Sequence, residues 1–352
     1  LFPREIDYTE WQTLRRYPIL NWNMGMTYRL RERDERVYPQ GELARRTIGQ
    51  VGDKGNYGVE YVLRDVLEGR DGKARRQRIA RGFYGRVVGG DNSEPEDGLD
   101  VVTTLDLEMQ DVADRALRRQ LEAQNALWGT ALVMEVATGD LLAMANLSRT
   151  KSGAYAEVKN HALSSRMEPG STFKLAALLA LVDDAGMSLD ETFDTGNGAR
   201  VKVGRTTVQD SHGLPPLNLK DAVAHSSNVF FARAVYETYK DDPERYVDYL
   251  RHLHLDRTVG LEEFGAVAPI FPAPGMKIWY PDVSIVNMGY GYAIELTPLH
   301  TLTLYNAVAN DGCMVAPRLV REIRRGGEVV ERPERRVLVD KICSSSALRK
   351  VR

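Results

Sequence analysis

Apolar and polar positions fall into distinct blocks from about residue 100 onwards. Residues 130–136 and 141–146 are short apolar runs, and the turn residues Ala137-Thr138-Gly139-Asp140 between them predict a β-hairpin. Residues 105–124 carry apolar side chains at helical spacing, so we expect a helix there with Thr104 as its N-cap. A helix followed by a hairpin and a further helix predicts an α+β domain with helices on an antiparallel sheet.

The most continuous apolar run of the chain, at residues 175–182, predicts a helix that is buried on most sides. Pro169-Gly170 precedes it as a turn. Asp183, Asp184 and Gly186 follow it and end it. The residues between the turn and the run therefore lie at the mouth of a buried helix.

Ser171 and Lys174 occupy that position, three residues apart, which places their side chains on one helix face about 5–6 Å apart at Cβ. Ser171 could simply be an N-cap, but a capping box places Glu or Gln where this chain has Lys174. A cation in the first turn opposes the helix dipole at a cost of roughly 0.3–1 kcal/mol. We therefore favour a nucleophilic serine with a lysine base whose pKa is lowered by burial. A second match, from Ser148 to Lys151, precedes no apolar helix and is interpreted as chance.

A second polar group, Ser226-Ser227-Asn228, lies on a predicted loop between a helix at residues 217–224 and one that begins at Val229. Serine and asparagine can end one helix and cap the next, so the residues alone leave a structural and a functional role equally open. A further hairpin is predicted near residues 199–208.

Composition narrows the class of protein without identifying it. The 352 residues are 43% hydrophobic and 27% charged, as in ordinary globular domains, and the net charge of −2 gives no case for nucleic-acid binding. No apolar run approaches the ~18 residues of a membrane span. The six histidines show no metal-ligand spacing, so we expect neither a metal nor a cofactor. Cys313 and Cys343 do not make a disulfide framework; they could pair, but we expect free thiols.

The acidic, breaker-rich segment at residues 89–98 is the best domain boundary in the chain. We therefore expect an N-terminal domain of short strands, loops and some helix at residues 1–98, including a helix near 60–68. A second domain at residues 99–352 would carry both polar motifs.

Together these motifs resemble the penicillin-binding proteins, whose signature is Ser-x-x-Lys, then Ser-x-Asn, then Lys-Thr-Gly. The resemblance covers nearly the whole chain. One similar segment, residues 97–106, spans the predicted boundary, and residues 129–135, 168–174, 224–231 and 296–299 lie in the predicted second domain. In the first domain the similar segments are residues 36–44 and 58–61, which resemble the non-catalytic pedestal of the class B, monofunctional members. The sequences of these segments most resemble those of the septal, cell-division type of the Bacteroides group.

The resemblance implies a peptidoglycan D,D-transpeptidase in which Ser171 forms an acyl-enzyme with a D-alanyl-D-alanine stem peptide. Lys174 would be the base, Ser226 a proton relay and Asn228 a contact for the substrate amide and the lysine. Thr172 and Ser227 would be further substrate contacts. β-Lactams would acylate Ser171. The family also implies a membrane glycosyltransferase and cell-division proteins as partners. It places both domains on the periplasmic face of the cytoplasmic membrane, behind one N-terminal anchor that this chain lacks.

The chain departs from the family in one respect, because no Lys-Thr-Gly follows Ser226. Lys202-Val203-Gly204 lies before Ser226 and is interpreted as part of a hairpin. We expect that the chain is truncated before the third motif, that C-terminal strands of its sheet are missing, and that it is poorly active as it stands. Two alternatives remain open: a β-lactamase or β-lactam sensor with the same serine–lysine pair, and a non-catalytic scaffold of the division machinery.

Overall fold

The computed structural model describes residues 10, 13–14, 16–18, 37–53, 55–73, 76–80, 83–86, 93 and 96–352. By its contacts the chain separates into two compact units, residues 1–41 and 42–352. The predicted boundary segment at 89–98 lies largely outside the described residues, so a division at 98/99 stays a prediction. No helix of the described residues is long and apolar enough to cross a membrane.

The described residues between 42 and 98 form short elements, as expected. The helices are α2 (Arg45–Ile48), α3 (Gly58–Val62) and α4 (Arg64–Leu67), and strands β1 (Arg76–Ala80) and β2 (Phe83–Arg86) pair as an antiparallel hairpin. The helix predicted at 60–68 is thus two short helices that meet at Leu63.

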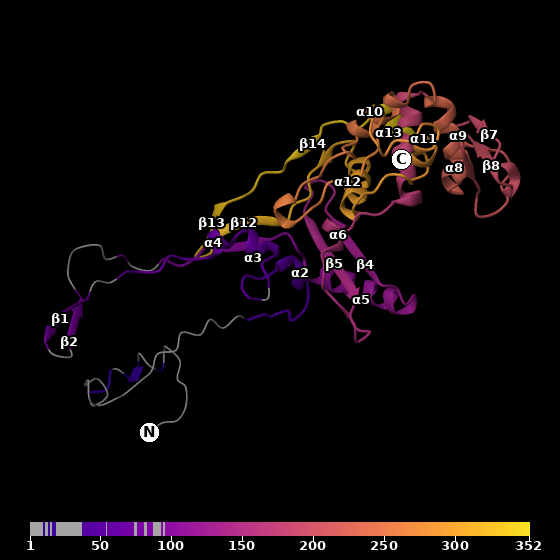
Figure 1. The fold of residues 1–352 in the computed structure, drawn as a ribbon. Coiled ribbons are helices and arrows are strands. Elements are labelled where there is room, and N and C mark those ends of the chain that lie inside the picture. Colours follow the sequence, from indigo (N-terminus) through magenta and orange to yellow (C-terminus); the bar gives the residue numbers. More distant parts are fainter. Residues whose placement is uncertain are drawn as a thin grey trace. The chain divides into compact units, whose positions relative to one another are not determined.

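The predicted central hairpin is confirmed. Strands β4 (Trp128–Met134) and β5 (Leu141–Arg149) pair antiparallel, and β6 (Tyr155–Ala156) adds to the far edge of β5. Helix α5 (Leu107–Ala123) packs along both long strands, as Figure 1 shows. Leu147 of β5 packs with Leu121 of α5. Leu141 and Met144 belong to a second apolar cluster. The sheet therefore carries apolar contacts on both faces, in the α+β arrangement that was predicted.

The N-cap of α5 was predicted wrongly. Asp106, not Thr104, caps the helix, and its carboxylate accepts the Met109 N–H at 2.9 Å. The buried Thr104 hydroxyl lies 2.7 Å from the carbonyl oxygen of Leu141 and 3.0 Å from that of Arg318. Thr104 thus joins the end of β3 (Asp100–Thr103) to β5 and to the segment before β12 (Val320–Arg325), which is the antiparallel partner of β3.

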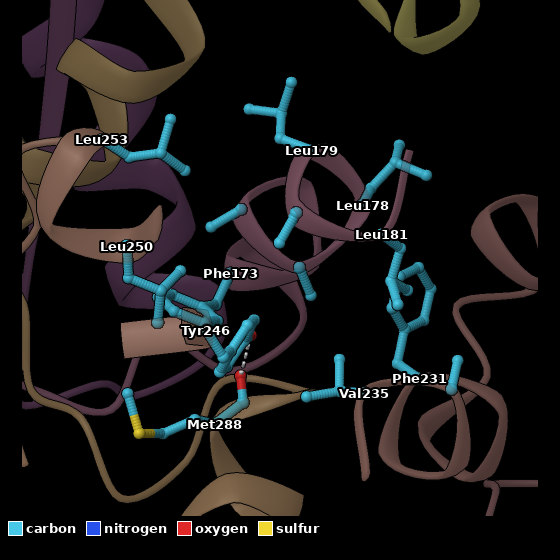
Figure 2. Packing of buried hydrophobic residues seen from close by; sticks show 14 of the residues in the cluster. Phe173, Leu178, Leu179, Leu181, Phe231, Val235, Tyr246, Leu250, Leu253 and Met288 are labelled. Carbon is cyan, nitrogen blue, oxygen red and sulfur yellow. Dashed lines mark hydrogen bonds between the residues drawn. The ribbon is translucent and has the colours of Figure 1, made fainter. Parts of the chain in front are cut away.

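The main core lies around the predicted buried helix. Its residues form α7 (Lys174–Leu179), continued by one π-helical turn at Ala180–Asp184. The helices α9 (Asn228–Tyr239), α10 (Pro243–His252) and α11 (Ser284–Met288) surround it, and Figure 2 shows their side chains meeting it. Tyr246 is fully buried there and its hydroxyl donates to the Met288 carbonyl at 3.3 Å. Each such large apolar side chain contributes roughly 1.5–3 kcal/mol by burial.

The remaining elements complete the second unit. The helices are α6 (His161–Ser164), α8 (Leu219–Ala224), α12 (Pro298–Ala309) and α13 (Ser345–Val351). The strands are β7 (Thr192–Phe193), β8 (Val201–Val203), β9 (Thr206–Val208), β10 (Leu217–Asn218), β11 (Met314–Val315), β13 (Glu328–Glu331) and β14 (Val337–Val339). Strands β8 and β9 form the predicted hairpin, with Lys202 inside it. Cys313 and Cys343 are free thiols, as expected.

Glu157 joins α2 to the central sheet. Its carboxylate accepts the Arg46 N–H at 2.7 Å and the Asn146 N–H at 3.3 Å. Burial raises the pKa of Glu157 from 4.5 to about 7, assisted by Asp114 and opposed by these two hydrogen bonds and by Arg118. A carboxyl whose pKa is raised in the folded state contributes stability below its unfolded pKa and loses it as pH rises through the folded pKa.

We predict that Glu157→Gln, which resembles the protonated carboxyl, is more stable than wild type at pH 8 by on the order of 2–3 kcal/mol. The difference should shrink to near zero by about pH 4.5. Urea unfolding of both proteins across this range measures it. A stability difference that does not change with pH would refute the prediction.

Candidate active site

Ser171 lies on a 3₁₀ turn, Gly170–Phe173, immediately before α7. Gly170 has a positive φ of 56°, and the Thr172 hydroxyl donates to the Pro169 carbonyl at 2.7 Å. The Ser171 side chain caps neither the turn nor α7, and the residue is exposed. The capping alternative is therefore excluded.

A second segment, at residues 291–293, is hydrogen-bonded to this turn and to Glu168 before it. The Gly170 N–H donates to the Gly291 carbonyl at 2.9 Å, and the Glu168 carboxylate accepts the Ala293 N–H at 3.0 Å. Gly291 has a φ of 94°, and a Cβ on it would lie 1.9 Å from the Gly170 oxygen. The chain therefore needs a glycine at 291, because two backbones touch there.

The amine of Lys174 is the centre of the site. The side chain is 6% exposed, and its Nζ lies 3.1 Å from Ser171 Oγ. Nζ also lies 2.7 Å from Asn228 Oδ1, 3.0 Å from Ser226 Oγ and 2.5 Å from the Ser226 carbonyl oxygen. Burial lowers the pKa of Lys174 from 10.5 to about 8, although the charge of Asp210 opposes this shift. The amine can therefore gain or lose a proton near neutral pH.

Ser226 and Asn228 reach Lys174 from the junction of α8 and α9. Ser226 has a φ of 52°, an unfavourable conformation for a residue other than glycine. Its carbonyl and hydroxyl both meet Nζ, whereas Asn228 is the first residue of α9. Strain of this kind is typical of functional sites. The structure thus brings together all four predicted catalytic residues, Ser171, Lys174, Ser226 and Asn228.

Ser227 does not occupy the position that was predicted for it. The side chain is 1% exposed, its hydroxyl donates to Asp210 at 2.8 Å, and its oxygen accepts the Phe230 N–H at 3.0 Å. We therefore revise its assignment from a substrate contact to the N-cap of α9. Buried serine hydroxyls satisfy helix termini in this way because the first N–H groups of a helix have no partner within it.

Asp210, which sequence reasoning missed, lies beside this junction. It is 6% exposed, and its carboxylate accepts from Asn228 N–H at 2.5 Å and Val229 N–H at 3.1 Å in addition to Ser227. A lone aspartate in a turn-rich segment carries no sequence signal for this position.

An apolar groove of about 590 Å³ lies beside the turn that carries Ser171, and Pro169 and Thr172 belong to its lining. It is lined by Thr130 and Leu132 of β4, by Leu302 and Tyr305 of α12, and by Thr172, whose carbonyl accepts the Tyr305 hydroxyl at 3.1 Å. Among the described strands, β4 pairs only with β5. Thr172 is exposed here, and its assignment as a substrate contact stays a prediction.

No group of three or more potential metal ligands occurs among the residues that the structure describes.

Comparison with known families agrees with this geometry. The model of the penicillin-binding protein transpeptidase domain matches residues 129–352, more than half of the chain and all four residues around the amine.

The chain belongs to the penicillin-binding protein transpeptidase family.

Two curated members of this family are similar along most of the chain. Penicillin-binding protein PbpB of Mycobacterium tuberculosis is 30% identical over 305 residues, 82% of this chain and 43% of the relative. The probable peptidoglycan D,D-transpeptidase FtsI of Caulobacter vibrioides is 26% identical over 336 residues, 93% of this chain and 50% of the relative. The chain thus spans about half the length of these curated relatives.

The fold agrees as well. A crystal structure of penicillin-binding protein 3 from Mycobacterium tuberculosis, complexed with aztreonam, superposes with a TM-score of 0.73 at 26% identity. The match covers 90% of this chain and 67% of that one. The fold is therefore that of a penicillin-binding protein transpeptidase domain with mixed helices and antiparallel strands.

The family resemblance implies that a penicillin acylates Ser171. On that expectation we predict that Gly291→Ala slows this acylation by at least about tenfold, because the new methyl group displaces the Gly170 backbone and with it the serine. Gly275→Ala is a matched control: Gly275 also has a positive φ, 84°, but has open space around its Cβ position. Rates of adduct formation by mass spectrometry compare the two variants. Equal effects would show that the close contact with Gly170 is unimportant.

Proposed function

We propose that this chain is the acyl-transfer part of a peptidoglycan D,D-transpeptidase. The observation that carries the proposal is the Lys174 amine, which lies within hydrogen-bonding distance of Ser171 Oγ, Ser226 Oγ and Asn228 Oδ1 at once. A serine is a weak nucleophile until a neighbouring base takes its proton, and a buried amine with a pKa of about 8 can do so.

In the proposed reaction, neutral Lys174 takes the proton of Ser171 as Oγ attacks the carbonyl carbon of the penultimate D-alanine. The tetrahedral intermediate collapses and breaks the peptide bond. The terminal D-alanine nitrogen receives a proton from Lys174 through Ser226, which leaves an ester on Ser171. An amine of a second stem peptide then attacks this ester and loses its proton to Lys174. The ester bond breaks, Lys174 returns that proton to Ser171 Oγ, and the new amide bond is the cross-link.

Asn228 has two proposed tasks in this scheme. Its Oδ1 accepts from Nζ of Lys174 at 2.7 Å and keeps the amine directed at the two serines. Its Nδ2 lies 3.5 Å from the Gln209 carbonyl oxygen, which is long for a hydrogen bond. A substrate amide oxygen can replace this weak contact. Thr172 lines the apolar groove and is proposed as a second substrate contact.

A β-lactam presents the same kind of carbonyl to Ser171, and its opened ring remains attached as the acyl group. We propose that β-lactams acylate this chain in that way. The relative named FtsI and the resemblance to septal members support a further proposal, that the protein acts in septal wall synthesis on the periplasmic face of the cytoplasmic membrane. The partners implied by the resemblance, a glycosyltransferase and division proteins, and the likeness to the Bacteroides group stay predictions.

The rate of acylation is a separate matter, because no Lys-Thr-Gly follows Ser226 in this chain. The resemblance implies that the strand with Lys-Thr-Gly supplies one backbone N–H to the oxyanion hole. Loss of one such donor costs roughly 10²–10³ in rate in other serine enzymes. We therefore expect slow rather than absent acylation. A β-lactamase would release the drug, whereas a non-catalytic scaffold would not react at all.

We predict a single penicillin adduct by intact mass after prolonged incubation, which is absent in Ser171→Ala. Ser148→Ala, which alters the other Ser-x-x-Lys, should behave as wild type. Failure to form any adduct at saturating penicillin would contradict the acyl-enzyme proposal and favour the scaffold. An adduct that is lost by turnover would favour the β-lactamase, and complete acylation within seconds would refute the expected impairment.

We also predict that the acylation rate rises with pH and levels off above about pH 8, because the base must be the neutral amine of Lys174. The rate constant for penicillin acylation, measured from pH 6 to 9.5, tests this. A rate that is independent of pH in this range would exclude Lys174 as the base.

A further inference from the structure

Asp210 lies in the loop between β9 and β10, and its buried carboxylate meets the first turn of α9. One oxygen accepts the N–H groups of Asn228 at 2.5 Å and Val229 at 3.1 Å, and the other accepts the Ser227 hydroxyl at 2.8 Å. The positive end of the helix dipole stabilises an anion in this position. The Asp210 carboxylate is therefore held in place by three hydrogen bonds at the start of α9.

These contacts fix the backbone from which two groups of the site project. Asp210 binds the main-chain N–H of Asn228, and the side chain of the same residue accepts from Lys174. The carbonyl and hydroxyl of Ser226 also contact Lys174. Ser226 immediately precedes Ser227 and Asn228, which both bind Asp210. A shift of the Asp210 carboxylate would consequently move the oxygens that surround the amine.

Asp210 also acts on Lys174 through its charge. The groups that touch Nζ are all neutral: the hydroxyls of Ser171 and Ser226, the Ser226 carbonyl and the amide of Asn228. The Phe231 ring lies 5.8 Å from the same atom. Of the described charged residues, Asp210 is the one that raises the pKa of Lys174 against the effect of burial. Without it the amine would be a weaker base.

We propose that Asp210 is a positioning residue for the acyl transfer proposed above: it holds Asn228 against Lys174 and supplies the counter-charge for the ammonium group. When Lys174 takes the Ser171 proton, a cation forms in a largely buried place, and a fixed anion nearby lowers the cost of forming it. The ammonium group of Lys174 must later release this proton. In this scheme Asp210 keeps the pKa of Lys174 high enough for it to take the proton from Ser171 and low enough for it to release the proton again. This inference rests on the proposed function for its chemical meaning.

The effect of the Asp210 charge on the pKa of Lys174 can be measured without any catalytic reaction. The measurement is an NMR titration of the Lys174 side chain in protein with isotope-labelled lysines. Asp210→Asn retains the shape and most hydrogen bonds but removes the charge, and we expect it to lower the pKa of Lys174 below the wild-type value of about 8. Ser227→Ala is the matched control, because it removes one contact of Asp210 and leaves the charge, and the pKa of Lys174 should stay as in wild type. An unchanged pKa in folded Asp210→Asn would overturn the proposal.

The positioning is tested by the pH profile of Ser171 acylation by penicillin. In Asp210→Asn the rising limb should move to lower pH, and the plateau should fall by about tenfold or more. Asp210→Glu retains the charge on a longer side chain, so its limb should stay while its plateau falls. A lower plateau without movement of the limb in Asp210→Asn would leave a purely structural role and overturn the proposal.

The outcomes also separate this inference from the proposed function. If wild type forms no adduct at Ser171, the proposed function fails, and the NMR titration alone decides whether Asp210 sets the charge of Lys174. If wild type is acylated and Asp210→Asn has the wild-type profile, the proposed function stands and the role of Asp210 is rejected. If Asp210→Asn does not fold, Asp210→Glu decides, since acylation at the wild-type rate would reject the positioning role.

Discussion

The structure of the site depends on one interaction, the hydrogen-bonded burial of the Lys174 amine. A charged amine in a buried place is costly unless oxygen atoms surround it, and Ser171, Ser226 and Asn228 provide them. Even with these partners the pKa of Lys174 falls to about 8. The result is an amine that exchanges a proton near neutral pH, which an exposed lysine does not do.

The surrounding fold supplies this environment through its main chain as much as through side chains. The buried helix α7 gives Lys174 a rigid base, because its apolar residues pack on α9, α10 and α11. Gly291 lets a distant backbone touch the turn that carries Ser171. The hydrogen bonds of Asp210 and the left-handed conformation of Ser226 fix the junction of α8 and α9, which carries Ser226 and Asn228. The packing of α7, the Gly291 contact and the Asp210 hydrogen bonds each join residues that are not neighbours in the sequence.

Sequence and structure agree best where the interactions are local. The pair Ser171 and Lys174 was predictable because an i, i+3 spacing at a helix start places two side chains together whatever the rest of the fold does. The hairpin of β4 and β5 and the buried helix α7 were predictable because alternation and apolar runs act over a few residues. The departure from the family pattern, a chain without Lys-Thr-Gly after Ser226, is likewise visible in the sequence.

The sequence by itself therefore determined the α+β class, the order of the two motifs and the family they resemble. Tertiary structure decided the rest. Thr104 and Asp106 are both good caps, and only the nearby carbonyls of Leu141 and Arg318 show why the threonine was used elsewhere. Asp210 and Ser227 acquired their roles in the same way, since a buried hydrogen bond between residues far apart in the chain leaves no local pattern. A polar side chain can form hydrogen bonds with many different groups, and only the folded structure decides which of these groups lie within its reach.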